Sequence, residues 1–164
     1  MDQTQVEQAH RHEEWREGVT MAIYINLSLL AVLLVIPENS TQTRAQLVVF
    51  ILASTLGLLL AHQVAFRLSS KFVHRGEIHH NLSRLLLAQG AGAATAAALA
   101  SAPVLIFGAD GIWLSEVLLL AFVCSIGFIA SRSGGASILK AIGYVAFLIV
   151  IVTALIIFKT IANH

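Results

Sequence analysis

The chain has 164 residues, of which 57% are hydrophobic and 12% are charged, and its formal net charge is +1. A soluble domain normally carries about 25% charged residues, so this composition argues against one, and the small net charge gives no support to a nucleic-acid partner. The mean hydropathy of +0.82 indicates a membrane protein surrounded by lipid. Cys124 is the single cysteine, which excludes a disulfide framework and a CxxC redox pair.

The first segment, residues 1–17, is polar and contains "HRHEEWREG". Its charge pattern differs from the basic start and short apolar core of a signal peptide. We expect residues 1–17 to form a polar cytoplasmic helix that precedes a single transmembrane domain, residues 18–164.

Five apolar segments follow within that domain, and breaks such as "PENS" and "RSGG" separate several of them. Backbone groups in lipid must form hydrogen bonds within their own segment, and the alternation typical of barrel strands is absent. The sequence therefore predicts an all-α integral membrane protein with five transmembrane helices, the third of which contains Pro103. The predicted spans are 19–36, 45–66, 82–107, 112–131 and 136–158, with a cytoplasmic loop at 67–81.

The basic residues predict the orientation of these spans, because Lys and Arg concentrate in cytoplasmic connections. With five spans and a cytoplasmic N-terminus, only Arg44 and Lys159 lie outside, and the C-terminus is also outside. The remaining basic residues are then cytoplasmic: Arg11, Arg16, Arg67, Lys71, Arg75, Arg84, Arg132 and Lys140.

The third span, "AQGAGAATAAALASAP", places small residues four positions apart. Helices associate in lipid by close approach of their backbones, so this helix is predicted to pack against another. The packing residues are Gly90, Gly92, Ala94 and Ala96. Ordinary packing within the chain, a subunit interface and a sliding face during transport all remain open.

Polar residues inside spans are candidate functional residues because they cost free energy in lipid. Asn26 lies near the middle of the first span, and His62 and Gln63 lie about one turn inside the second, with Arg67 at its boundary. A neutral imidazole can bind a metal or transfer a proton near neutral pH. We place these four residues on a translocation path, while structural hydrogen bonds between helices remain the alternative.

"HRGEIHH" gathers three histidines and a glutamate in the cytoplasmic loop. His74, Glu77, His79 and His80 are predicted metal ligands, because nitrogen and oxygen donors suit divalent Fe, Mn or Zn. Their spacing matches no closed metal signature, so pH sensing and a solvated loop near anionic lipid remain alternatives.

The end of the chain, "ASRSGGASILKAIGYVAFLIVIVTALIIFK", resembles the last helix pair of the vacuolar iron transporter family. "AAALASAPVLIF" resembles that family's third helix, and "EGV" at 17–19 is similar to the Asp-Gly-Ile/Val that opens its first helix. The resemblance implies a homodimer whose two first helices line a path for a divalent metal exchanged for protons. It also places Glu17 on that path, in the position of the family's aspartate.

The second helix departs from the family pattern. "LLAHQVA" stands where the family carries S-M-x-x-G-E-Y, so His62, Gln63 and Glu17 would have to replace the lost ligands. The leading hypothesis is a transporter or channel for a metal cation or proton, in a homodimer or higher homo-oligomer within the bilayer. The alternative is a structural or accessory membrane subunit that transports nothing. An enzyme is not predicted, because no nucleophile–base pair is apparent.

Overall fold

A computed structural model describes residues 3–36, 42–73 and 82–162 of the protein. Across these ranges the backbone forms α-helices joined by short turns, with no strand. The predicted all-helical class is therefore confirmed for the described part of the chain. The elements are α1 (Gln3–Val35), α2 (Arg44–Val73), α3 (Leu82–Phe107), the short 3-10 helix η1 (Gly108–Asp110), α4 (Gly111–Ser133) and α5 (Ile138–Ala162).

Each predicted span coincides with one helix, but α1 begins well before the first span, and α2 continues to Val73, into the predicted loop 67–81. The polar residues from Gln3 onward continue without interruption into the apolar part of the same helix, through Gly18. A glycine in a helix interior costs about 1 kcal/mol relative to alanine. Gly18 is tolerated there because it packs against α3.

Three stretches of the described residues are long and apolar enough to cross a membrane: Arg11–Val35, Arg44–Ser69 and Ser83–Ser133. The third stretch contains both α3 and α4, and α5 contributes a shorter apolar helix, Ile138–Ala154. One side of α2 also exposes large apolar side chains at every fourth position: Leu52, Leu56, Leu60, Val64 and Leu68. An apolar surface of this extent suits lipid, so the long helices indicate a membrane location.

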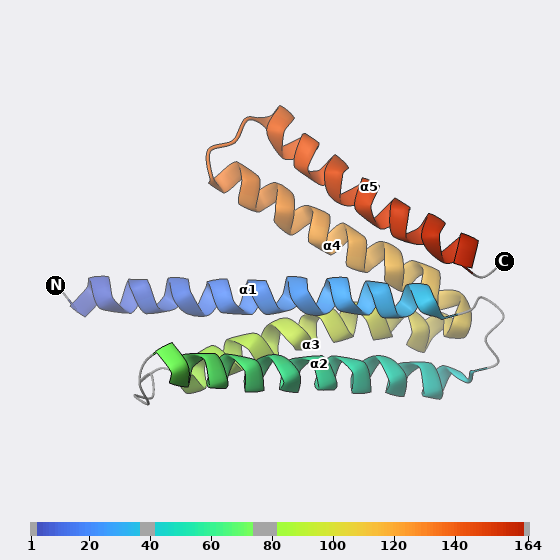
Figure 1. Ribbon diagram of the computed structural model, residues 1–164, viewed down its shortest axis with the longest axis horizontal. Helices are drawn as coiled ribbons and strands as arrows, with labels where there is room; N and C mark the ends of the chain where they lie inside the picture. Colours follow the sequence, from blue (N-terminus) through green and yellow to red (C-terminus); the bar gives the residue numbers. More distant parts are fainter. Residues whose placement is uncertain (1–2, 37–41, 74–81, 163–164) are drawn as a thin grey trace.

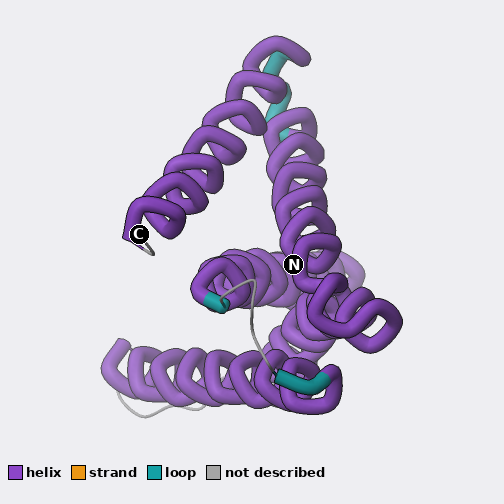
Figure 2. Tube along the Cα trace, turned by 90° about the vertical axis from the view of Figure 1, so that its right-hand side faces the viewer, coloured by secondary structure: helices purple, strands orange, loops and turns teal. Residues whose placement is uncertain are grey.

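The helices alternate in direction, and the two ends of the chain lie at opposite ends of the molecule (Figure 1). Helices α1, α2 and α3 pack together, and α4 packs on both α1 and α3. The α4–α5 hairpin leans away from this group, as the view from the end also shows (Figure 2). Helix α5 therefore packs mainly on α4 and only slightly on α1.

Large residues of α1 pack against small residues of α3 in the core. Met21, Ile25, Leu29 and Leu33 recur every four positions along α1, and each is completely buried. The facing surface of α3 is formed by Ala93, Ala96, Ala100 and Val104. Small side chains on one helix let the other helix approach closely. In lipid, where the hydrophobic effect does not drive helices together, this close van der Waals packing holds them.

The turn between α3 and α4 depends on Gly108, whose φ of 69° is one that L side chains rarely adopt. Below this turn the Ser115 hydroxyl donates to the carbonyl oxygens of Ala100 (2.7 Å) and Gly111 (3.0 Å). The bond to Ala100 joins α4 to α3. This hydrogen bond fixes the start of the α4–α5 hairpin on α3, whereas the far end of the hairpin has fewer neighbours.

Candidate functional site

Helices α1 and α3 make backbone contact at Gly18 and Gly92. A Cβ atom at Gly92 would overlap the carbonyl oxygen of Gly18, and one at Gly18 would lie 3.1 Å from the carbonyl oxygen of Ala88. Only glycine at position 92 permits this separation of the two helices. Polar side chains next to the contact are consequently within reach of each other across the helix interface.

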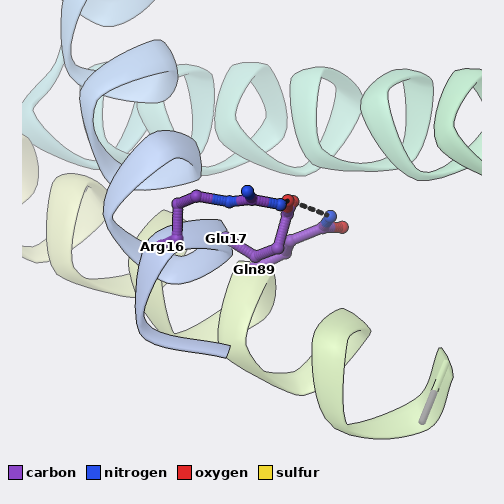
Figure 3. A network of polar contacts seen from close by, with 3 residues as sticks. All are labelled: Arg16, Glu17 and Gln89. Atoms are coloured by element: carbon purple, nitrogen blue, oxygen red, sulfur yellow. Dashed lines mark hydrogen bonds and ion pairs between the residues drawn. The ribbon is translucent and has the colours of Figure 1, made fainter. Parts of the chain in front are cut away.

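Glu17 and Gln89 form a hydrogen bond beside this contact (Figure 3). The Gln89 side-chain amide donates from Nε2 to Oε2 of Glu17 at 3.2 Å. Arg16 donates from Nη2 to the other carboxylate oxygen at 3.5 Å. Gln89 is completely buried, whereas the Glu17 side chain retains 16% of its exposure. A carboxylate at the edge of the α1–α3 interface is thus held by a buried amide.

The buried side-chain polar atoms without a hydrogen-bond partner are all oxygens. Among the described residues they are Oε1 of Glu14, Oδ1 of Asn26 and Oε1 of Gln89. Glu14 does form an ion pair with Arg84, but the 3.8 Å between Oε1 and Nη1 is too long for a hydrogen bond. Leaving a buried acceptor unpaired costs about 1–3 kcal/mol. Each oxygen would be stabilised by a cation, a proton donor or a water molecule.

The arrangement around Glu17 can therefore hold a positive charge. A carboxylate with the carbonyl oxygen of an amide is a donor set that hard cations accept, and the carboxylate can alternatively take up a proton. Within the described ranges, no group of three or more His, Cys, Asp and Glu side chains is placed to bind a metal ion. Any cation at this site would need Gln89, or ligands from another molecule, to complete its shell.

The predicted path residue His62 contacts α1 at a different level from Glu17. Its ring lies 5.7 Å from the ring of Tyr24, at an interplanar angle of 37°. His62 is half-buried, as is Gln63, while Arg67 is exposed on the same helix. Tyr24 follows Glu17 by about two turns, so the two residues share the side of α1 that faces α2. The sequence placed His62 and Glu17 on one path, but His62 contacts Tyr24, about two turns along α1 from Glu17.

Asn26 lies on another side of α1. It follows Glu17 by about two and a half turns, which places it on the opposite face of the helix. Its side chain is completely buried and donates from Nδ2 to the carbonyl oxygen of Ala22 at 2.8 Å. A straight path along one face of α1 would thus contain Glu17 or Asn26, but not both.

The predicted metal ligands His74, Glu77, His79 and His80 lie outside the described residues. The four predicted packing residues of α3 fall on different sides of the helix. Gly92 and Ala96 are buried toward α1, whereas Ala94 is exposed and a Cβ at Gly90 would meet nothing within 4 Å.

The sequence interpretation missed Gln89, although a signal was present. An amide that follows "LLLA" and precedes the glycine-rich part of the third span is a polar residue in lipid, which by itself marks a candidate site. It also precedes Gly92 by about one turn, so a close helix contact at Gly92 brings it near a neighbouring helix.

Comparisons with protein-family models, with curated proteins and with solved structures find no match for this chain. The resemblance to the vacuolar iron transporters therefore stays a prediction.

Proposed function

We propose that the protein is a five-span membrane protein that carries a metal cation or a proton across the bilayer, with Glu17 and Gln89 in its cation site. One observation carries this proposal. An ionisable carboxylate lies at the edge of a glycine-mediated helix contact and is held by a completely buried amide whose own oxygen has no partner. Polar groups of this kind are expensive in a membrane and mark ion pathways.

The proposed topology has the N-terminus in the cytoplasm and the C-terminus outside. It is supported by the alternating direction of the helices, which leaves the chain ends at opposite ends of the molecule (Figure 1). It is also supported by the basic residues, most of which fall in the cytoplasmic connections of this arrangement. A homodimer or higher homo-oligomer is part of the proposal, because copies of α1 could jointly complete the ligand shell of a cation.

The chemistry of Glu17 suggests how transport would be coupled. An ionised carboxylate attracts a cation, whereas a protonated one does not, so proton and cation binding at one carboxylate exclude each other. Arg16 is a further competitor, since its guanidinium already lies 3.5 Å from Oε1 of Glu17. A cation entering the site would displace this weak contact, and it would bind the unpaired oxygen of Gln89 once the amide has rotated, because Nε2 faces Glu17 in the present arrangement. These features favour exchange of a cation for a proton.

Flux through purified protein in liposomes tests the proposal. Uptake of H⁺, Na⁺, Mn²⁺, Fe²⁺ and Zn²⁺ is measured across an imposed pH gradient. We expect at least one ion to enter faster than into protein-free liposomes, and Glu17→Gln to reduce that flux by about tenfold or more, since it removes the negative charge at position 17 that attracts a cation. Asp110→Asn is the matched control, because this carboxylate is exposed in η1. His62→Ala measures the predicted contribution of α2.

The accessory-subunit alternative makes the opposite prediction. Wild-type liposomes would then be no more permeable to any ion of the panel than protein-free liposomes. The melting temperature of the purified protein would also be unchanged by Mn²⁺, Fe²⁺ or Zn²⁺. Flux that persists unchanged in Glu17→Gln would reject the Glu17 site while leaving transport itself intact.

A further inference from the structure

The far end of the α4–α5 hairpin carries positive charge, and the neighbouring part of the sequence contains no carboxylate. We define the hairpin tip as residues 129–140, which include the end of α4, the turn and the start of α5. Arg132 and Lys140 are both exposed there. No Asp or Glu occurs anywhere in residues 117–164. The tip is thus a cationic surface without acidic neighbours along the chain.

Cations of α1 and α3, by contrast, form ion pairs with carboxylates of the same chain. Arg16 pairs with Glu17 and Arg84 pairs with Glu14. Within the described part of the chain, no such ion pair involves Arg132 or Lys140. The hairpin leans away from α1, the helix that carries Glu14 and Glu17 (Figures 1 and 2). The charge at the tip is therefore available to a partner outside the chain.

Arg132 is held in place across the turn. Its Nη1 atom donates to the carbonyl oxygen of Ala136 at 2.9 Å. A guanidinium has five N–H donors in a planar arrangement that matches phosphate oxygens. One donor is used by Ala136, so the others remain for an anion, and less conformational entropy is lost on binding than with a free side chain.

Large apolar side chains surround these two cations. Ile129, Ile138 and Leu139 retain 65%, 58% and 80% of their exposure. Leu139 is directly next to Lys140 in the chain, and Ile129 is one turn before Arg132. A surface that combines exposed apolar residues with unpaired cations matches the boundary between acyl chains and anionic headgroups.

We infer that the hairpin tip binds the phosphate headgroup of an anionic phospholipid, with Arg132 and Lys140 contacting the phosphate and Ile138 and Leu139 contacting the acyl chains. This inference rests on the membrane location in the proposed function. It does not depend on the cation site at Glu17, which lies on other helices. In the proposed topology the partner is a lipid of the cytoplasmic leaflet, because Arg132 and Lys140 lie on the cytoplasmic side.

Thermal unfolding of the full chain in neutral detergent tests the inference. Phosphatidylglycerol is titrated into one sample and phosphatidylcholine into another, and apparent affinity is obtained from the rise in melting temperature. We expect phosphatidylglycerol to bind the wild type more tightly than phosphatidylcholine does. Each of Arg132→Gln and Lys140→Gln should weaken phosphatidylglycerol binding about fivefold. Arg11→Gln, an exposed cation in the acid-containing part of α1, is the matched control and should leave the affinity unchanged.

Three outcomes would overturn the inference. Equal affinity for the two lipids would show that charge is not recognised. A loss in Arg11→Gln as large as in the tip variants would show a diffuse charge effect. Stabilisation by inorganic phosphate matching that by phosphatidylglycerol would point to a free anion instead of a lipid.

Circular dichroism checks that the tip variants are folded. Glu17→Gln should retain lipid binding, so failure of the cation site and failure of the lipid site are distinguishable.

Discussion

The α1–α3 contact and the α4–α5 hairpin are built from similar apolar helices, yet they differ in how tightly they pack. Glycine residues let the α1 and α3 backbones touch, and the interface contains the buried amide of Gln89. The hairpin tip has neither close contacts nor buried polar groups, and α5 is largely exposed. Where the backbone contact is closest, the chain can hold polar groups in defined positions. The hairpin offers surface to lipid instead.

This comparison implies that the two regions respond differently to substitution. Substitutions at the α1–α3 contact should alter stability and cation handling together, because the same residues define the helix separation and the site. Substitutions at the tip should alter lipid binding with little effect on stability.

Gly92→Ala should be strongly disruptive for so small a substitution. The new Cβ would overlap the carbonyl oxygen of Gly18, so α1 and α3 must separate, and overpacking of this kind typically costs about 1–3 kcal/mol. Unfolding in mixed micelles, followed by circular dichroism, measures the change. Gly57→Ala and Gly143→Ala are the controls, because a Cβ at either position meets nothing within 4 Å. If Gly92→Ala were as stable as these controls, the close backbone contact would not exist in the membrane.

The hydrogen bond between Gln89 and Glu17 should be the next largest contribution. A double-mutant cycle with Gln89→Leu and Glu17→Leu isolates its energy, because each substitution removes one partner of the bond. We expect a coupling of about 1.5–3 kcal/mol if Glu17 is ionised, as is usual for bonds to charged groups. A coupling near zero would mean that the two side chains do not interact. The same variants, assayed for flux, show whether the bond holds Glu17 in position for transport.

Asn26→Leu should stabilise the protein by about 1 kcal/mol, since it removes a buried oxygen without a partner and keeps a similar volume. Thr55→Val is the control, because the buried Thr55 hydroxyl donates to the carbonyl oxygen of Ile51. A gain in stability with unchanged flux would assign Asn26 a structural role. A gain in stability accompanied by lost flux would keep it on the translocation path, as the sequence suggested.

The sequence was informative about helices and much less so about sites. Apolar runs bounded by "PENS" and "RSGG" located the apolar part of each helix, because the need for internal hydrogen bonds in lipid leaves little choice of backbone. The continuation of α1 through Gly18 was not anticipated. A glycine after charged residues normally favours a break, and only the packing of α3 against it reverses that preference.

The site could be predicted only in part, because it depends on which faces of the helices meet. Glu17 was a candidate from its resemblance to an aspartate at the start of the first helix of the iron transporters. Its bond to Gln89 joins residues 72 positions apart, and no local pattern specifies such a pairing. Asn26 and Glu17 both looked like residues of one path, yet their spacing places them on opposite faces of α1.

The contact between Tyr24 and His62 should have the smallest effect, and it tests whether α2 participates in the site. Tyr24 retains 40% of its exposure, so a double-mutant cycle with Tyr24→Leu and His62→Leu should give a coupling of only about 0.5–1 kcal/mol. The informative measurement is flux compared with stability in the same variants. If flux falls far more than a change of that size can explain, His62 belongs to the transport path and α2 moves with α1. If flux and stability change in proportion, the ring contact is packing, and the α1–α3 contact alone carries the proposed site.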